Sequence, residues 1–225
     1  MKDRPLSLII LATLLCIALP VSATTDTFSN NYIPKITFSH FSTNEGLSQS
    51  TVVSSCQDKF GRMWFATHDG LNMFDGHRFT IYKNVQKDST SLINNIIRHV
   101  YCDNEGDIWI GTEKGLSYYD ITKDSFRNFP TQNRPVSGIA RAGDEELMIA
   151  AGGNILFFDT DSWTLKTDCH IGQLESVDAT ILYRQEDNIW IGTRQDGLFC
   201  YSISSKEFRR ISAFTSNRSI ECIIM

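Results

Sequence analysis

The sequence of 225 residues lacks the features that mark several large classes of protein. It has no excess of basic residues, because 21 Lys and Arg stand against 26 Asp and Glu, for a formal net charge of -5. A weakly acidic chain without a basic block is a poor binder of nucleic-acid phosphates, so no nucleic-acid partner is expected. Apolar residues at helical spacing are absent over any long window, which excludes an α-solenoid.

The motifs of common catalytic sites are also absent. There is no P-loop, no G-x-S-x-G, no H-E-x-x-H and no C-x-x-C. The five histidines, at positions 40, 68, 77, 99 and 170, are scattered, and none pairs with another at metal-ligand spacing. The sequence therefore predicts no enzyme activity, no catalytic residue, no cofactor and no metal in this chain. His68 and Asp69 are predicted to form a solvated turn, and the alternative is a site on a loop face.

Long apolar runs are limited to one at the N-terminus. Residues 1–23 combine basic Lys2 and Arg4, an apolar run over residues 6–19 and a small-residue end at Ala23, which is typical of a secretory signal peptide. A membrane anchor is disfavoured because a spanning helix needs about 20 apolar residues. A lipoprotein signal at Cys16 is disfavoured by the large Leu14 and Leu15 before it. We expect an exported, periplasmic chain with no membrane span after cleavage behind Ala23.

Cysteines are few beyond the signal peptide. Five remain, at positions 56, 102, 169, 200 and 222. Their number is odd and no pair has C-x-x-C spacing, so a disulfide framework is not expected. The expected role is that of small buried hydrophobes in strands.

What the sequence does contain is an internal repeat. Its anchors Trp64, Trp109, Met148 and Trp190 lie 45, 39 and 42 residues apart. Three units read W-[IF]-[GA]-T followed by Gly-Leu, and the unit at Met148 is degraded. Asp-x-x-Gly, a tight-turn signal, precedes the first two tryptophans. With a β-rich run before that turn, and the tryptophan strand and two further runs after it, each unit predicts four short antiparallel strands, the unit of a β-propeller blade.

The predicted fold is therefore all-β: an incomplete β-propeller of four-stranded antiparallel blades over residues 36–225, behind a linker at 24–35. It comprises four blades, at about 50–83, 94–130, 136–167 and 177–212, and a lone strand at each end, 36–43 and 218–225, the latter starting a fifth blade. The predicted structural repeat positions are Asp58, Gly61, Trp64, Gly70, Asp103, Gly106, Trp109, Gly111, Gly115, Trp190, Gly192 and Gly197.

Stacking gives the repeat its physical logic, because one sheet cannot bury both of its faces alone. The tryptophans are predicted to fill the space between blades, and the blade at Met148 to pack less fully. Unpaired blade edges lead us to expect that the isolated mature chain self-associates or is only marginally stable. The alternative is that four blades close on themselves, with residues 36–43 near 208–211.

The pattern D-x-x-G-x-x-W-[IF]-[GA]-T-x-x-G-L resembles the two-component regulator propeller repeat. The spacer at 91–96 and the leader at 38–48 are similar to parts of the same bacterial hybrid sensors. The resemblance covers about residues 36–225. It implies a periplasmic propeller that senses an oligosaccharide from polysaccharide breakdown, followed in such sensors by further propeller, membrane and histidine-kinase parts. Those parts are not in this sequence, so we expect a fragment or truncated product of such a sensor.

Two other functions stay open. The chain could be part of a secreted propeller enzyme, of sialidase or lyase type. However, sialidase repeats have one residue fewer between Asp and Gly than the Asp58–Gly61 segment has, and no arginine cluster or nucleophile pair is evident. It could also be a propeller scaffold for protein partners, although Phe or Ile follows each of the three repeat tryptophans where Trp-Asp repeats carry Asp. The residues that bind a ligand are not identified by sequence.

The signal peptide makes a direct prediction about the exported chain. Cleavage behind Ala23 gives a mature N-terminus at Thr24, because Val21 and Ala23 are the small residues that the peptidase reads. Intact-mass measurement of the exported product checks this. Recovery of the chain in a membrane fraction with residues 1–23 attached would contradict it.

Overall fold

The computed structural model describes residues 37–166, 178–212 and 219–220. The predicted signal peptide and linker, and all but two residues of the predicted strand at 218–225, lie outside the described residues. The chain divides into two compact units, residues 1–39 and 40–225, and the second carries every strand described below. No helix within the described residues has the length and apolar character needed to cross a membrane.

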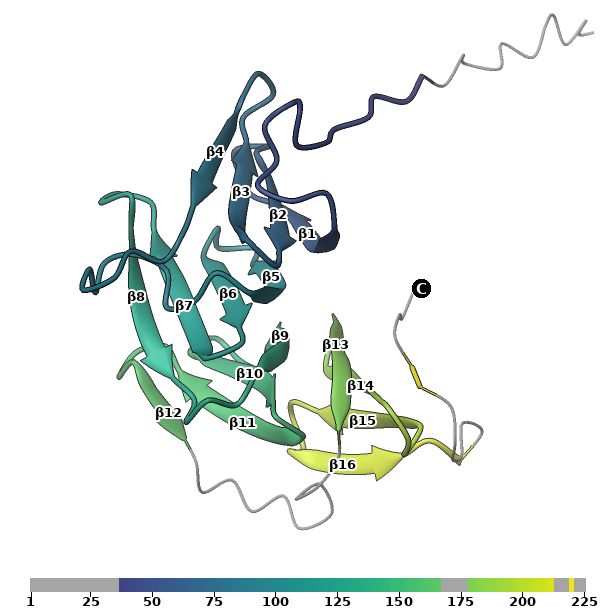
Figure 1. Ribbon diagram of the computed structural model, residues 1–225. Helices are drawn as coiled ribbons and strands as arrows, with labels where there is room; N and C mark the ends of the chain where they lie inside the picture. Colours follow the sequence, from purple (N-terminus) through teal and green to yellow (C-terminus); the bar gives the residue numbers. More distant parts are fainter. Residues whose placement is uncertain (1–36, 167–177, 213–218, 221–225) are drawn as a thin grey trace, which may run out of the picture. The chain divides into compact units, whose positions relative to one another are not determined.

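The second unit is built from four antiparallel sheets of four strands each, and within each sheet the strands follow chain order (Figure 1). The first sheet contains β1 (Val52–Gln57), β2 (Met63–Thr67), β3 (Gly70–Phe74) and β4 (Phe79–Tyr82). The second contains β5 (Ile97–Cys102), β6 (Ile108–Thr112), β7 (Gly115–Asp120) and β8 (Ser125–Pro130). The third contains β9 (Val136–Arg141), β10 (Glu146–Ala151), β11 (Asn154–Asp159) and β12 (Thr164–Lys166). The fourth contains β13 (Ala179–Gln185), β14 (Asn188–Thr193), β15 (Leu198–Ser202) and β16 (Glu207–Arg210).

The sheets pack face to face in chain order. The first strand of each sheet contacts the first strand of the next, β1 with β5, β5 with β9 and β9 with β13. Three apolar clusters fill the spaces between the first and second, second and third, and third and fourth sheets. This confirms the predicted all-β architecture of stacked four-stranded blades. Within the described residues no strand of the first sheet pairs with one of the fourth, so the ring is not closed by hydrogen bonds.

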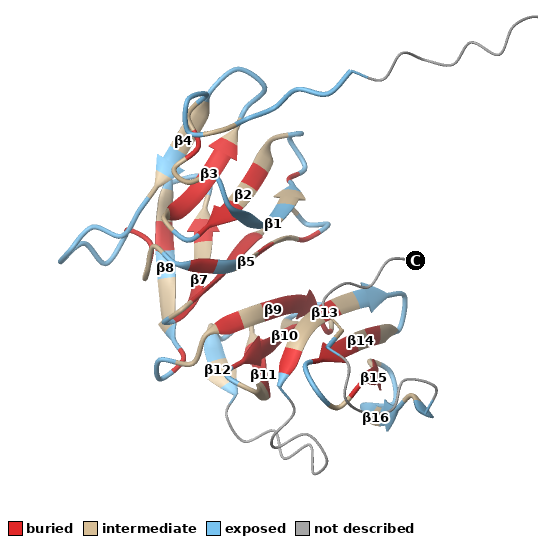
Figure 2. Ribbon diagram, turned by 45° about the vertical axis from the view of Figure 1, so that its right-hand side comes forward, coloured by how far each residue is buried: buried red, intermediate tan, exposed pale blue. Residues whose placement is uncertain are grey.

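Strand β10 shows how the two faces of an inner sheet are shared. Its side chains alternate along the strand: Leu147 and Ile149 belong to the cluster against the second sheet, and Met148 and Ala150 to the cluster against the fourth. Five of its six residues are buried, and the burial colours of Figure 2 mark this strand as core. The expectation that this degraded repeat packs less fully is wrong, because Met148 is itself completely buried and fills the place of the missing tryptophan.

Trp64 and Trp109 each point toward the following sheet. Trp64 packs with Tyr119 of the second sheet, and Trp109 with Phe158 of the third; both tryptophans are fully buried. Trp190 is only half-buried. Its strand neighbours Ile189 and Ile191 face the third sheet, so strand alternation directs the indole to the other side of the fourth sheet.

Gly111 and Gly192, each two residues after a repeat tryptophan, permit close approach of a later segment of the chain. A Cβ on Gly111 would lie 2.5 Å from the carbonyl oxygen of Val136, the first residue of β9. A Cβ on Gly192 would lie 2.8 Å from a side-chain carbon of Ile220. Backbone atoms cannot yield to such overlaps as a flexible side chain can, so glycine is required where sheets approach this closely.

The predicted lone strand at residues 36–43 is not a strand over its described residues. Residues 37–42 have no regular structure, and a turn begins at Thr43. The backbone N–H and hydroxyl of Ser42 donate to the Glu45 carboxylate, each at 2.6 Å, and this local bonding replaces a strand ladder. Phe41 is held by its ring, which packs on Phe74 and Phe79 of the first sheet. Phe41 thus contacts the first sheet through its ring, where a strand was predicted.

The cysteines differ from expectation in one respect. Cys56 of β1 and Cys102 of β5 form a disulfide, with Cα atoms 5.9 Å apart, whereas Cys200 is free and buried as predicted. Treating all five as free was wrong, because the criterion was spacing in sequence. The two cysteines are 46 residues apart, about one repeat, and sit at equivalent places in adjacent first strands. The bond joins two neighbouring sheets covalently.

We expect the double variant C56S/C102S to lower the free energy of unfolding by about 2–4 kcal/mol, because the bond restricts a long loop of the unfolded chain. Urea melts with and without reductant measure the effect. The native chain and a Cys200→Ser control should lose stability on reduction, whereas the double variant should not respond. Equal stability of the native and double-variant chains under oxidising conditions would contradict the prediction.

Candidate functional site

The turn between β1 and β2 is organised by Asp58, whose carboxylate is buried. One oxygen accepts from the backbone N–H groups of Phe60 and Arg62, at 2.9 and 3.0 Å. The other accepts from Trp64 Nε1 at 2.9 Å and Arg62 Nε at 2.7 Å. Burial by itself raises the pKa of Asp58, but the hydrogen bonds from Trp64 and Arg62 outweigh it and lower the pKa. The carboxylate is thus a charged cap that also fixes the core tryptophan.

Asp103 occupies the equivalent turn between β5 and β6, but it bonds differently. One oxygen accepts from the backbone N–H groups of Glu105, Gly106 and Asp107. The other accepts from Arg141 Nη2 of the third sheet at 2.7 Å, and both side chains are buried. Trp109 Nε1, the counterpart of Trp64 Nε1, is buried and has no hydrogen-bond partner among the residues that the structure describes. The same sequence motif therefore bonds within its own sheet at Asp58 and across to the next sheet at Asp103.

The Arg141 side chain lies among three acidic groups. The carboxylates of Asp103, Glu105 and Asp107 lie within 4.8 Å of one another, a spacing that could hold a cation. Arg141 Nη2 is 2.7, 3.0 and 3.7 Å from these three carboxylates. The guanidinium thus supplies the positive charge of this cluster, and the arrangement is an ion-pair network between the second and third sheets.

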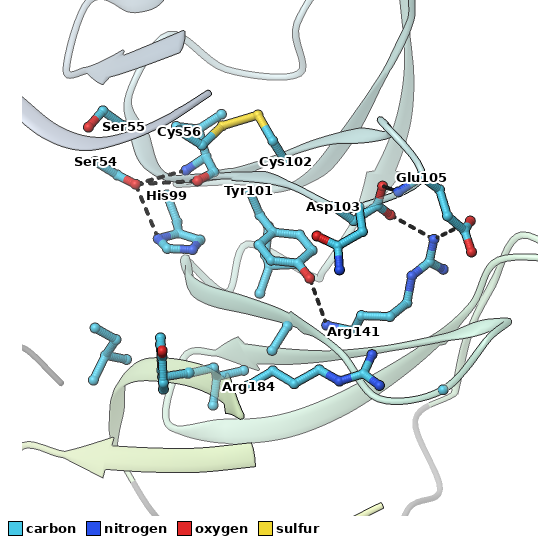
Figure 3. Close-up of a pocket in the computed structure, with 18 of the residues that line it drawn as sticks. Ser54, Ser55, Cys56, His99, Tyr101, Cys102, Asp103, Glu105, Arg141 and Arg184 are labelled. Atoms are coloured by element: carbon cyan, nitrogen blue, oxygen red, sulfur yellow. Dashed lines mark hydrogen bonds and ion pairs between the residues drawn. A yellow bond between two sulfur atoms is a disulfide. The ribbon is translucent and has the colours of Figure 1, made fainter. Parts of the chain in front are cut away.

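One cavity, of about 670 Å³, is lined by the first strands of all four sheets and by the turns that follow β5, β9 and β13 (Figure 3). Ser54, His99 and Tyr101 contribute from β1 and β5, and Arg141 and Arg184 from β9 and β13. The backbone N–H of Arg141 donates to the Tyr101 hydroxyl at 3.3 Å. The Cys56–Cys102 disulfide also lies in the wall. A ligand here would touch four sheets at once.

His99 is half-buried in this wall, with Nδ1 3.4 Å from the Ser54 hydroxyl oxygen. Burial lowers the pKa of His99 to about 4 because it disfavours the charged imidazolium. The ring is therefore neutral at neutral pH. The Ser54 hydroxyl also donates to the carbonyl oxygen of Val100, at 3.4 Å, so it is engaged with the neighbouring strand.

A second cavity, of about 570 Å³, lies where these first strands begin. All four sheets or their connecting turns supply residues to it. They are Val53, His68, Arg98, Pro135, Ser137, Gly152, Gly153, Asp178, Ala179, Thr180 and Arg194. The His68 side chain is exposed in this wall, while the Asp69 carboxylate accepts from Lys83 Nζ at 2.7 Å. His68 and Asp69, which were predicted to form one solvated turn, thus differ: the His68 side chain faces the cavity, whereas the Asp69 carboxylate is paired with Lys83.

The repeat glycines occupy turns and sheet contacts and not the ligand-sized cavities. Gly61 and Gly106 lie in the turns before β2 and β6, each with positive φ. Gly70 and Gly115 open β3 and β7, and Gly197 precedes β15. Gly111 and Gly192 sit at the sheet contacts described above. Of the twelve repeat positions only Asp103 lines either cavity, and its carboxylate is already bound by Arg141.

Sequence reasoning did not single out the cavity residues Arg98, His99, Tyr101, Arg141 and Arg194. They lie outside the Asp, Gly and Trp positions that define the repeat pattern, so that pattern offered no signal for them. A charged residue at the end of an otherwise small and apolar strand, as Arg141 is in V-S-G-I-A-R, is the one sequence clue that was available. Their convergence depends on stacking of sheets from separate repeats.

Four-stranded antiparallel sheets that stack in series, with their first strands around shared cavities, define a β-propeller architecture. The sequence comparisons specify the repeat type. The two-component regulator propeller family matches residues 46–69 and 91–114. These segments run through the first-strand turn and tryptophan strand of the first and second sheets, so the match falls on two of the four sheets.

Parts of the chain are also similar to individual known proteins. A 55-residue segment is 54% identical to Histidine kinase P4 of Formosa agariphila, and it covers 24% of this chain and 4% of that protein. Among solved structures, the extracellular domains of two B. thetaiotaomicron proteins, described as the hybrid two component systems BT3049 and BT4673, share the fold. They give TM-scores of 0.52 and 0.59 at 22% and 20% identity, covering 79% and 72% of this chain. This chain spans 32% and 25% of those structures.

The pKa of His99 predicts a pH-dependent stability. Because the folded pKa is about 4 and an unperturbed histidine titrates near 6.5, the unfolded chain binds more protons between these values. Stability is then fully present above about pH 6.5 and falls as pH drops toward 4, by up to about 3 kcal/mol. Urea melts at pH 4.5, 5.5 and 7 of His99→Gln should show a flatter pH dependence than the native chain. A His77→Gln control, at an exposed turn, should keep the native slope; equal slopes in both variants would contradict the prediction.

Proposed function

We propose that this chain is the ligand-sensing propeller region of a two-component signal-transduction receptor, exported to the periplasm, and that its ligand is a carbohydrate. The observation that carries the proposal is the match of two-component regulator propeller repeats to residues 46–69 and 91–114. The predicted signal peptide supports export. The names of the matched histidine kinase and of the two extracellular domains support the receptor class.

The two cavities support the binding of a polar ligand of oligosaccharide size. Their volumes, about 670 and 570 Å³, fall in the range of small-molecule sites. Their walls offer arginine, carboxylate, hydroxyl and histidine groups, which can donate to and accept from sugar hydroxyls. Tyr101 and Tyr183 add aromatic surface to the larger cavity. Such a mixture suits a ligand with many hydroxyl groups.

The arrangement also gives a physical route from binding to signalling. Residues of the same cavity belong to strands of four sheets, which contact one another chiefly through neighbouring first strands and the apolar clusters behind them. A ligand that bridges the sheets favours the arrangement to which it binds best and so shifts the population of packing states. In a receptor, the downstream signalling domains would respond to that shift in population.

Ligand binding should raise the thermal stability of the exported chain. We expect one or more pools from a panel of polysaccharide digests to raise the melting temperature by roughly 5–10 °C when the active sugar is at about 100 times its dissociation constant. The panel comprises digests of pectate, alginate, chondroitin sulfate, xylan, mannan and galactan, tested by thermal shift and confirmed by calorimetry. Glucose at equal mass concentration is the control. A panel without any binder would overturn the carbohydrate proposal.

A further inference from the structure

The second cavity contains two arginines whose guanidinium groups are only partly used. Arg98 Nε donates to Glu113 Oε2 at 2.7 Å, and Arg194 Nε donates to Asp178 Oδ2 at 2.8 Å. Within the residues that the structure describes, the terminal nitrogens of both arginines have no hydrogen-bond partner. The side chains are 44% and 61% exposed, so those nitrogens are accessible from the cavity.

The carboxylate partners help to hold each arginine in position. An arginine bound through Nε has its planar group oriented, and this lowers the conformational entropy lost when the terminal nitrogens bind a second group. Glu113 lies outside the lining of the cavity, whereas Asp178 lies within it. The lining itself therefore has two guanidinium groups against one carboxylate, in a chain whose overall charge is -5. The imidazole of His68 adds a further donor to the same wall.

The arginines come from different sheets. Arg98 is the second residue of β5, and Arg194 lies in the turn after β14 of the fourth sheet. The wall between them includes Gly152 and Gly153, which follow β10 of the third sheet. Neither glycine has a side chain to fill the space, and a Cβ on Gly153 would meet nothing closer than 4.0 Å. The second cavity therefore has space for a ligand group beside the terminal nitrogens of Arg98 and Arg194.

We propose that this second cavity is the anion-binding part of the ligand site, and that Arg98 and Arg194 select an acidic oligosaccharide. The charged group is the carboxylate of a uronic acid or a sulfate ester, because guanidinium donors match the oxygens of such groups. The inference rests on the proposed function, since it specifies the class of carbohydrate. Neutral sugars lack the group that these donors would bind.

The test uses the exported chain and the same digest panel, with the variants Arg98→Gln, Arg194→Gln and the double variant. We expect pectate, alginate or chondroitin sulfate pools to bind, and affinity to fall about tenfold in each single variant, because a hydrogen bond to a charged group is lost. Arg78→Gln is the matched control, because this arginine is also exposed and paired with a carboxylate, Asp75, but does not line the cavity. It should bind as the native chain does. Thermal melts verify that each variant is folded.

Salt dependence of the native chain gives a second readout that needs no variant. Affinity for an acidic pool should fall as NaCl rises from 50 to 500 mM, whereas a neutral ligand should be insensitive. Binding of neutral pools alone, or of acidic pools with equal affinity in the double variant, would overturn the anion site and leave the carbohydrate proposal standing. Uronate and sulfate pools distinguish the two sources of charge. Absence of binding by every pool would instead overturn the proposed function.

Discussion

Each four-stranded sheet of this protein can bury its second face only against the next sheet, and the rest of the structure depends on that constraint. A period of about two along each strand divides the side chains between two neighbours, as β10 shows by sending Met148 and Leu147 into different clusters. The repeat tryptophan is the largest element of this packing. Its burial is complete at Trp64 and Trp109, where a following sheet lies against it.

The polar turns serve the same stacking. Asp58 fixes the tryptophan of its own sheet, whereas Asp103 binds an arginine of the next sheet, and Trp109 Nε1 has no partner within the described part of the chain. An unsatisfied buried donor costs roughly 1–3 kcal/mol. The charge-assisted bond between Asp103 and Arg141 offsets such a loss and adds a link between sheets. Together with the Cys56–Cys102 disulfide it joins the first three sheets along the side that carries the larger cavity.

The proposed ligand binding depends on residues that differ from one repeat to the next. The repeat positions build turns, interfaces and close backbone approaches, so they are largely unavailable to a ligand. Residues between them, such as His68, Arg98 and Arg194, are free to differ from one unit to the next. Stacking brings them to common cavities. A propeller can in this way keep the same packing between sheets while a few side chains determine which ligand it binds.

Repeat spacing, turn residues and strand patterning determined the class of this protein directly from its sequence, because each blade is a local unit with the same local chemistry. The four-stranded sheets, the turn roles of Asp58 and Asp103 and the burial of Trp64 follow from that reasoning. Contacts between units were decided only by tertiary structure. The disulfide joins cysteines one repeat apart, the end segment near Phe41 packs by its ring and not by a ladder, and Arg141 reaches a carboxylate 38 residues away. Local sequence does not encode these contacts between units, because they are set by how adjacent sheets twist and stack. The same stacking brings Arg98 and Arg194 to one cavity.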